Sequence, residues 1–331
     1  MSTQIVYALI ASESDLFIEE VWTSIFSLRL YDQSRKVVVC CDTPTAERIR
    51  LFPELEKLIN EVVVVPIPDD CNTPKLKSRQ IKTTVRQYVE GNFLFVDTDT
   101  VFCSPVTEID TLECDIAAVR EYHLPLSESP FRHLVVANMM NVYGVDVSGS
   151  DQWHNSGVLY VADNKKTREF YRQWNKNWRF SAMIKGMSQD EPALMRTDYD
   201  YGYIIKELPD IFNCQPSMSV RYLSDARIIH FLHMCFPADK SFCPFIDKSF
   251  YKRMHDEGGL TPVMAEEIRN VRSSFASPSC IVGWRTMNFM TSPVFPVLEK
   301  IYNEGGAASW LMLKAAKLLE KIHKYTKKIQ Q

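Results

Sequence analysis

Two acidic residues one position apart are the clearest candidates for chemistry in this chain. Asp97 and Asp99 follow the apolar run Phe93–Val96 in the segment FLFVDTDTVF. In a continuing strand the two side chains share a face, and in a turn they can converge on one cation. Hard divalent ions prefer oxygen ligands, and a diphosphate supplies further oxygens. The spacing therefore fits a divalent metal site and fits equally a pair of solvated acids at a strand end.

The segments around this acidic pair predict an α/β domain with a mainly parallel central sheet. Short apolar runs alternate with segments of helical periodicity, which indicates βαβ units. Ligands bind beyond the carboxyl ends of such strands, which is where the acidic pair and Asp42 lie. The expected strands up to this point are Ile5–Ala11, Val37–Cys41, Val62–Val65 and Phe93–Val96, and the expected helices are Leu16–Leu30, Thr45–Ile59 and Leu76–Tyr88.

The rest of the chain has weaker patterns. Two stretches, Glu121–Trp153 and Pro237–Pro296, have no clear period and are expected to be irregular, and a loop as long as the first is usually functional or mobile. Further strands are expected at Ile116–Val119, Gly157–Val161 and Ile228–Leu232, with a helix at Asn164–Trp178.

Composition restricts the class of protein. The 331 residues are 46% hydrophobic and 24% charged, which suits one large domain with an appendage or two modest domains. A formal net charge of −3 excludes a basic surface of the kind that binds nucleic acid. Nine scattered cysteines without a CxxC pair argue against a zinc site or a disulfide framework. Without a signal peptide or a run of ~20 apolar residues, we expect a cytoplasmic protein that contacts a membrane only at its surface.

Three further segments carry a family resemblance. They are HNSGVLYV at His154–Val161, QDEPAL at Gln189–Leu194 and IIHFL at Ile228–Leu232. With the DTD segment, in this order, they resemble GT-A glycosyltransferases, especially family 8, the glycogenin and lipopolysaccharide galactosyltransferase type. The resemblance spans roughly residues 4 to 235. It implies a Rossmann-like GT-A fold and metal-dependent transfer of a sugar, with retention, from a nucleotide-sugar such as a UDP-hexose to a glycan or lipid-linked acceptor.

The resemblance also implies roles for residues near the reacting sugar. Asp97, Asp99 and His230 would bind Mn²⁺ or Mg²⁺, although a histidine on a strand can equally be a core residue. Asn155 would contact the donor or acceptor sugar. Asp190 would lie beneath the reacting sugar, and Glu191 occupies the position of a family glutamine. An alignment shifted to Gln189 and Asp190 stays open. The catalytic candidates are thus Asp190, Glu191 and Asn155.

Other residues are implied in binding the nucleotide-sugar. Leu9, Ala11 and Ser12 would cradle the nucleoside, and Thr98 lies between the two metal-binding acids. Arg79 would reach the diphosphate, with Lys75, Lys77 and Lys82 as rivals or as parts of a solvated basic helix face. The family's Lys-Pro-Trp after the histidine is missing, and Lys240 is the candidate replacement.

Two other classes of protein fit parts of the sequence. FLFVDTDTVF also resembles the first motif of haloacid-dehalogenase-type phosphatases, in which Asp97 would be a nucleophile and Asp99 a general acid. That motif usually opens its domain, whereas several α/β elements precede it here, and no later acidic GDxxxD-like segment follows. A catalytically silent GT-A relative is the other alternative, favoured by Glu191 and by the missing tripeptide.

The C-terminal segment has a distinct character. Residues 308–331 carry six lysines against one glutamate, with Leu311, Leu318 and Ile322 on one helical stripe. Such a basic amphipathic helix can lie on anionic lipid, or it can pack on the main domain or on a second subunit of a homo-oligomer. We therefore expect a catalytic domain at 1–236 and an acceptor-side, irregular region at 237–331 that ends in this helix.

Overall fold

The computed structural model describes residues 2–217, 219–232, 243–276 and 284–329. A seven-stranded sheet lies at its centre, in the order β3-β2-β1-β4-β7-β6-β8. All of its strands run in one direction except β7, which pairs antiparallel with β4 and with β6. These strands are β1 (Gln4–Leu9), β2 (Val37–Cys41), β3 (Glu61–Val64), β4 (Phe93–Val96), β6 (Ile116–Arg120), β7 (His154–Val161) and β8 (Ile205–Glu207).

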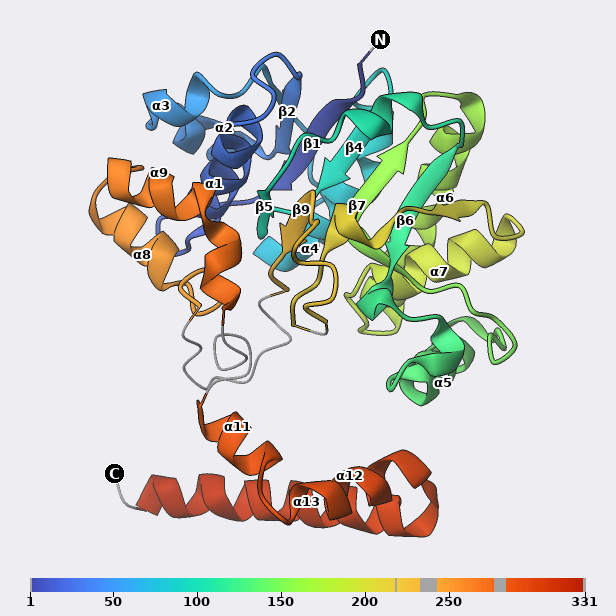
Figure 1. Ribbon diagram of the computed structural model, residues 1–331. Coiled ribbons are helices and arrows are strands. Elements are labelled where there is room, and N and C mark those ends of the chain that lie inside the picture. Colours follow the sequence, from blue (N-terminus) through green and yellow to red (C-terminus); the bar gives the residue numbers. More distant parts are fainter. Residues whose placement is uncertain (1, 218, 233–242, 277–283, 330–331) are drawn as a thin grey trace.

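Helices cover both faces of this sheet (Figure 1). Because side chains alternate along a strand, Ile5 and Tyr7 of β1 enter the hydrophobic core on the α1 side, whereas Val6 enters the core that contains Trp174 of α6. The helices of the first half are α1 (Phe17–Arg29), α2 (Thr43–Ile49), α3 (Pro53–Glu56), α4 (Pro74–Thr84) and the 3-10 turns η1 (Val85–Gln87) and η2 (Thr107–Thr111).

A small second sheet lies beside the end of β4. It pairs β5 (Thr100–Phe102) antiparallel with β9 (Ile228–His230) and so brings residues 130 positions apart into contact. The remaining elements of the α/β body are η3 (Glu121–His123), η4 (Leu126–Glu128), α5 (Arg132–Tyr143), α6 (Lys165–Arg179), η5 (Phe180–Ile184), α7 (Glu191–Asp200) and η6 (Asp210–Asn213).

The C-terminal third is helical. Side chains of α8 such as Phe250 and Met254 share a core with α1, so residues after position 236 help to build the α/β body. By contrast, α12 buries no side chain, and Figure 1 shows α11, α12 and α13 set apart from the sheet. These elements are α8 (Ser249–Asp256), α9 (Pro262–Arg269), η8 (Val271–Phe275), α11 (Trp284–Met290), α12 (Phe295–Glu304) and α13 (Gly306–Ile329).

Two expectations of irregular structure were wrong. The stretch 121–153 contains α5, with the sequence RHLVVANMMNVY. This helix buries only Met139 and Val142, so its apolar residues do not recur with a helical period that the sequence could show. The stretch 237–296 contains α8 and α9, which are only eight residues each and give too short a window for periodicity.

Among the described residues, no helix combines the length and the apolar character needed to span a bilayer.

Candidate functional site

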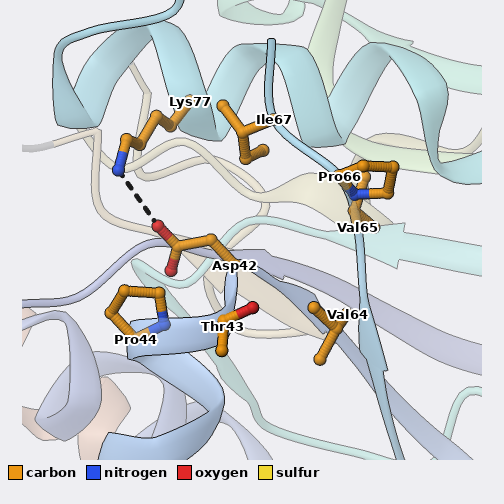
Figure 2. A pocket seen from close by; sticks show the side chains of 8 residues that line it. All are labelled: Asp42, Thr43, Pro44, Val64, Val65, Pro66, Ile67 and Lys77. Carbon is orange, nitrogen blue, oxygen red and sulfur yellow. Dashed lines mark hydrogen bonds and ion pairs between the residues drawn. The ribbon is translucent and has the colours of Figure 1, made fainter. Parts of the chain in front are cut away.

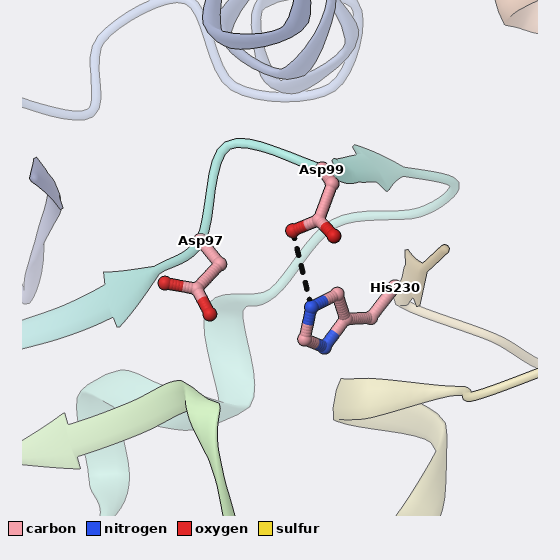
Figure 3. A group of neighbouring side chains, drawn as sticks. All are labelled: Asp97, Asp99 and His230. Carbon is pink, nitrogen blue, oxygen red and sulfur yellow. Dashed lines mark ion pairs between the residues drawn. The ribbon is translucent and has the colours of Figure 1, made fainter. Parts of the chain in front are cut away.

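Asp97, Asp99 and His230 form one cluster. Asp97 and Asp99 lie in the turn between β4 and β5, and the pairing of β5 with β9 sets His230 opposite Thr100. One potential ligand atom from each of the three residues lies within 4.8 Å of the others, and His230 Nε2 is 3.2 Å from Asp99 Oδ1 (Figure 3). The sequence indicated only through the family resemblance that these three residues lie together. The pairing of β5 with β9 in the short second sheet is the physical reason that they do.

Gly157 provides the space in which the cluster sits. It lies on β7 opposite the acidic turn, and its carbonyl accepts a hydrogen bond from the Asp97 amide at 2.8 Å. A Cβ at this position would overlap the imidazole of His230 and lie 2.8 Å from Asp97 Oδ2. Only glycine therefore allows the imidazole and the first carboxylate to approach the same point.

The donor set suits a divalent cation such as Mn²⁺ or Mg²⁺. Two carboxylates supply hard oxygen ligands, and a neutral imidazole is a common third ligand. Burial alone would lower the pKa of His230, but the charges of Asp99 and Asp97 raise it above its ordinary value. This mutual attraction between the imidazole and the carboxylates gathers the three ligands around one position.

A buried lysine connects the acidic turn to the strand and helix beside it. Lys82 of α4 is 1% exposed, and its ammonium donates hydrogen bonds to Asp97 Oδ2 at 3.0 Å and to Ser156 Oγ at 3.0 Å. The same ammonium lies 3.2 Å from Asp190 Oδ2. One side chain of α4 thus joins β4, β7 and the start of α7.

Asp190 is fully buried between positive charges. Ser156 Oγ lies 2.8 Å from its Oδ2, and Arg79 Nε lies 2.6 Å from its Oδ1. The contact with Arg79 is an ion pair whose angle is not that of a hydrogen bond, so Oδ1 retains an unused lone pair. Burial would raise the pKa of Asp190, but the charges of Arg79 and Lys82 outweigh it and hold the pKa well below its ordinary value.

Glu191, the next residue, has the opposite tendency. Burial and the adjacent charge of Asp190 raise the pKa of Glu191. Its Oε1 lies 3.2 Å from Ser156 Oγ, whose single proton can serve only one of the two carboxylates at a time. Asp190 is therefore the carboxylate that stays ionised, and Glu191 is the one that more readily takes a proton.

The reversed direction of β7 places Asn155 in the site, because the beginning of this strand lies at the carboxyl ends of its neighbours. Its amide donates a hydrogen bond to Glu121 Oε2 at 2.7 Å, and its Oδ1 accepts from Gly157 N at 2.8 Å. Glu121 follows β6 and is buried. Burial and the charge of Glu191 raise its pKa to about 7.

A pocket of about 430 Å³ opens at the same edge of the sheet, beyond β2 and β3. Figure 2 shows Asp42 and Lys77 of its lining paired with each other, with Oδ2 and Nζ 3.2 Å apart. The Asp42 side chain also caps α2 by accepting from Thr45 N at 3.1 Å. The pocket is thus one strand beyond β1 and does not include the acidic cluster. Its lining residues are Asp42, Thr43, Pro44, Val64, Val65, Pro66, Ile67 and Lys77.

The remaining predicted binding residues are dispersed. Leu9 is buried in the hydrophobic core, so only its backbone can meet a ligand. The amide of Ala11 donates to Thr45 Oγ1, and the hydroxyl of Ser12 donates to Asp15. Thr98 Oγ1 lies 3.4 Å from Glu20 Oε2. Lys240 lies outside the described residues.

Several residues of the site had no predicted role. Glu121 lies two residues after the predicted strand Ile116–Val119, so the carboxyl-end rule could have indicated it. Ser156 and Gly157 stand inside the HNSG segment at the beginning of β7, where that rule does not apply. Lys82 was only one of several rivals to Arg79, because the helical period of α4 does not show which lysine is buried. Asn213, whose amide contacts both Asn155 and His230, had no signal in the sequence.

Comparison with known proteins identifies the fold. No protein-family model and no curated protein sequence matches the chain. Among solved structures, WbbM, a bifunctional glycosyltransferase in its apo form, is similar with a TM-score of 0.53 and 14% identity over 81% of this chain and 51% of that one. This chain therefore spans about half of that bifunctional protein.

Two further solved structures are similar over nearly their whole length. The galactosyltransferase LgtC, solved with donor and acceptor sugar analogues, has a TM-score of 0.49 and 13% identity over 83% of this chain and 97% of that one. Mouse xyloside xylosyltransferase 1, in its apo form, has a TM-score of 0.46 and 11% identity over 70% and 97%. Together with the mainly parallel sheet and its single reversed strand, the likeness to WbbM gives this chain the GT-A fold of nucleotide-sugar transferases.

Proposed function

We propose that this protein is a glycosyltransferase that transfers a sugar from a nucleotide-sugar with the help of a divalent cation. The observation that carries the proposal is the convergence, at one edge of a GT-A sheet, of the Asp97, Asp99 and His230 cluster with Asp190. The buried cation of Lys82 links the two parts, since it contacts both Asp97 and Asp190. Neither part alone specifies sugar transfer, but their shared lysine holds an ionised carboxylate beside the acidic turn that would bind the cation.

Asp97, Asp99 and His230 would hold Mn²⁺ or Mg²⁺. Such a cation, when bound, supplies positive charge that stabilises a departing diphosphate. Arg79 and Lys82 add fixed positive charge near Asp97. Because both are already held by Asp190, they need little rearrangement when negative charge develops nearby.

The pocket beyond β2 and β3 would receive the nucleoside. It lies two strand spacings from β4, or about 10 Å, a distance that a ribose and a diphosphate can bridge. Its apolar lining from Val64, Pro66 and Ile67 suits a flat base, and Asp42 and Lys77 offer hydrogen bonds to the polar edge of the base. Ala11 and Ser12 lie at the end of β1, between the pocket and the acidic cluster.

Asp190 would stabilise the sugar as positive charge develops at the anomeric carbon. The charges of Arg79 and Lys82 keep this carboxylate ionised, which is the form that an oxocarbenium-like centre requires. Asn155 and Glu121, which are joined by a hydrogen bond, would face the acceptor. We propose that the acceptor hydroxyl transfers its proton to the leaving phosphate oxygen and that the product retains the anomeric configuration.

The test is a screen of nucleotide-sugars for release of nucleoside diphosphate in the presence of Mn²⁺. We expect at least one UDP-hexose to be turned over, slowly with water and faster with a glycan acceptor. Asp190→Asn should retain donor binding and lose turnover by a factor of 10² or more, the usual scale for removing one electrostatic stabiliser. Full turnover by Asp190→Asn would show that this carboxylate has no part in the reaction.

Of the two alternative classes, the phosphatase has lost support. The acidic turn follows the fourth strand of a GT-A sheet, and Lys82 holds the Asp97 carboxylate that would have to act as a nucleophile. The silent relative predicts donor binding without turnover of any nucleotide-sugar, so the same screen also tests it.

The C-terminal helices would attach the protein to the surface of an anionic membrane, where a lipid-linked acceptor is found. The apolar side chains Leu311, Leu318 and Ile322 are each at least half exposed, so this stripe does not pack on the α/β body. Lys314, Lys317 and Lys321 are exposed on the same helix. Exposed apolar groups with neighbouring cations are the features that bind a helix to anionic lipid.

A further inference from the structure

Asn213 connects the proposed metal ligand His230 to Asn155. The segment after η6 pairs with β9, since Cys214 N donates to Ile228 O and His230 N donates to Cys214 O. This pairing sets the buried amide of Asn213 between the two side chains. Asn213 Oδ1 lies 3.1 Å from His230 Nδ1, and Asn213 Nδ2 lies 2.8 Å from Asn155 Oδ1.

The backbone amide of Gly157 determines the direction of the hydrogen bonds that run from it through Asn155 and Asn213 to His230. Gly157 N can only donate, so the Asn155 atom 2.8 Å from it must be the oxygen. The other Asn155 atom is then the NH₂ group, which donates to the Glu121 carboxylate at 2.7 Å. The orientation of Asn155 is therefore determined independently at both of its ends.

The same logic determines the orientation of Asn213. The Asn213 atom that faces the Asn155 oxygen must be the NH₂ group, which leaves the Asn213 oxygen toward the imidazole. This oxygen accepts a hydrogen bond from Nδ1–H, whereas Nε2 faces a second acceptor, the Asp99 carboxylate. When Nε2 gives its lone pair to a cation, the single proton of the neutral ring must be on Nδ1, where Asn213 accepts its hydrogen bond.

We propose that Asn213 is a positioning residue that holds His230 as the Nδ1–H tautomer, so that Nε2 is available to a divalent cation. This inference rests on the metal site of the proposed function. A group that orients a metal-binding histidine through its second nitrogen typically changes metal affinity by 10- to 100-fold when it is removed. Here the orienting chain runs from Gly157 N through Asn155 and Asn213 to the ring.

The first experiment measures Mn²⁺ affinity by electron paramagnetic resonance without nucleotide. Asn213→Leu keeps a side chain of similar size but offers no acceptor, and we expect its Kd for Mn²⁺ to rise by about 10-fold or more. Asn164→Ala is the matched control, since it removes a hydrogen-bonded asparagine that caps α6 far from the cluster, and its Kd should equal that of wild type. An unchanged Kd in Asn213→Leu, with wild type binding normally, would overturn this inference and leave the proposed function standing.

A double-mutant cycle tests whether Asn155 and Asn213 act through one chain. Asn155→Ala frees the Asn213 amide to rotate and should also weaken Mn²⁺ binding. Once Asn213 is already leucine, Asn155→Ala should add little, because no orientation remains to be lost. Fully additive effects on the Kd for Mn²⁺ would show that Asn155 and Asn213 do not act through one series of hydrogen bonds.

A third measurement needs no variant. Long-range ¹H–¹⁵N spectra of histidine-labelled wild-type protein, recorded at alkaline pH with and without the diamagnetic ion Mg²⁺, report which nitrogen of His230 carries the proton. With Mg²⁺ bound, we expect protonated Nδ1 and unprotonated Nε2. A ring that is protonated on Nε2 in protein that has bound Mg²⁺ would overturn the inference, whereas a His230 signal that Mg²⁺ does not change would overturn the metal site.

Discussion

At the scale of single residues, the site depends on what surrounds each carboxylate. Asp97 and Asp190 have the same side chain, but Asp97 lies at a half-exposed turn, whereas Asp190 is fully buried against Arg79 and Lys82. The first is open to an incoming cation, and the second is fixed by cations that the protein itself supplies. The site requires Gly157 as strictly as it requires either acid, because a side chain at this position would fill the space between Asp97 and His230.

Gly157→Ala tests this requirement for space. The new methyl group would overlap the imidazole and crowd Asp97 Oδ2, so the ligands must separate. We expect Mn²⁺ affinity to fall about 10-fold or more, measured by titration calorimetry. Gly149→Ala is the control, because a Cβ there meets no atom within 4 Å and its affinity should not change. Normal Mn²⁺ binding by Gly157→Ala would mean that the cation does not sit between these side chains.

His154 makes a pH-dependent contribution to stability. Burial and the charge of Arg120 lower its pKa from 6.5 to about 4, and its Nε2 has no hydrogen-bond partner among the residues that the structure describes. In the unfolded chain this histidine gains its proton near pH 6.5, so the unfolded state binds more protons between pH 6.5 and 4. The contribution is therefore present above pH 6.5 and is lost as the pH falls toward 4, by up to about 3 kcal/mol.

The measurement is the free energy of unfolding in urea at several pH values. His154→Gln should lose less stability than wild type between pH 6.5 and 4, because glutamine does not titrate. The exposed His133→Gln should keep the wild-type pH dependence. Identical pH dependence in wild type and His154→Gln would show that the buried imidazole is not the group that titrates.

At the scale of elements, the reversed strand β7 and the helix α4 assemble the site. An all-parallel sheet would present only strand ends at this edge, whereas β7 contributes its beginning, with Asn155 and Gly157. The buried ammonium of Lys82 then joins α4 to β4 and β7. Removing it leaves Asp190 charged and buried with one cation fewer.

Lys82→Met should therefore destabilise the fold strongly. We expect a loss of about 3–5 kcal/mol in the free energy of unfolding, the usual cost of breaking a buried ion pair from one side. Lys166→Met is the comparison, since it breaks an equally short ion pair with Asp115 at the surface and should cost less than about 1 kcal/mol. Equal effects in denaturant titrations would show that Lys82 is no more important than a surface lysine.

The sequence predicted these elements unevenly. The first four strands and the helices expected at Leu16–Leu30 and Leu76–Tyr88 were found nearly in place, because apolar runs and helical periods are local signals. The helix expected at Thr45–Ile59, with an interruption at Pro53, is two short helices, α2 and α3, and Pro53 begins the second. The pairing of β5 with β9 and the reversal of β7 were not found, since pairing between distant segments leaves no local pattern. Asp97, Asp99 and His230 came from motifs, whereas the burial of Lys82 and the place of Asn213 depend on tertiary contacts.

At the scale of the whole molecule, the acidic cluster and the C-terminal helices have separate tasks in the proposed function. The α/β body, including α8 and α9, encloses a common core, whereas α13 exposes Leu318 and Leu319 beside its lysines. An exposed apolar surface of this kind marks an interaction site.

Sedimentation with vesicles tests the membrane proposal. The full chain should sediment with vesicles that contain anionic lipid and should be released by salt, which screens the lysine charges. Leu318→Ser/Leu319→Ser should reduce binding, whereas Leu51→Ser, at an equally exposed leucine of the α/β body, should not. If wild type stays in solution and light scattering reports a dimer, the helices bind a second copy of the chain instead.

The central claim is that nucleotide and metal bind together at the acidic turn. Its most direct test is the thermal stability of wild type and of Asp97→Ala/Asp99→Ala with UDP, with Mn²⁺ and with both. A ligand at about a hundred times its Kd adds roughly 2.7 kcal/mol of stability, which is a shift of a few degrees in Tm for a chain of this size. We predict a shift in wild type that is larger with both ligands than with either alone and is absent in the double variant. The same shift in both proteins, or none in wild type with UDP or any other nucleoside diphosphate, would contradict the account.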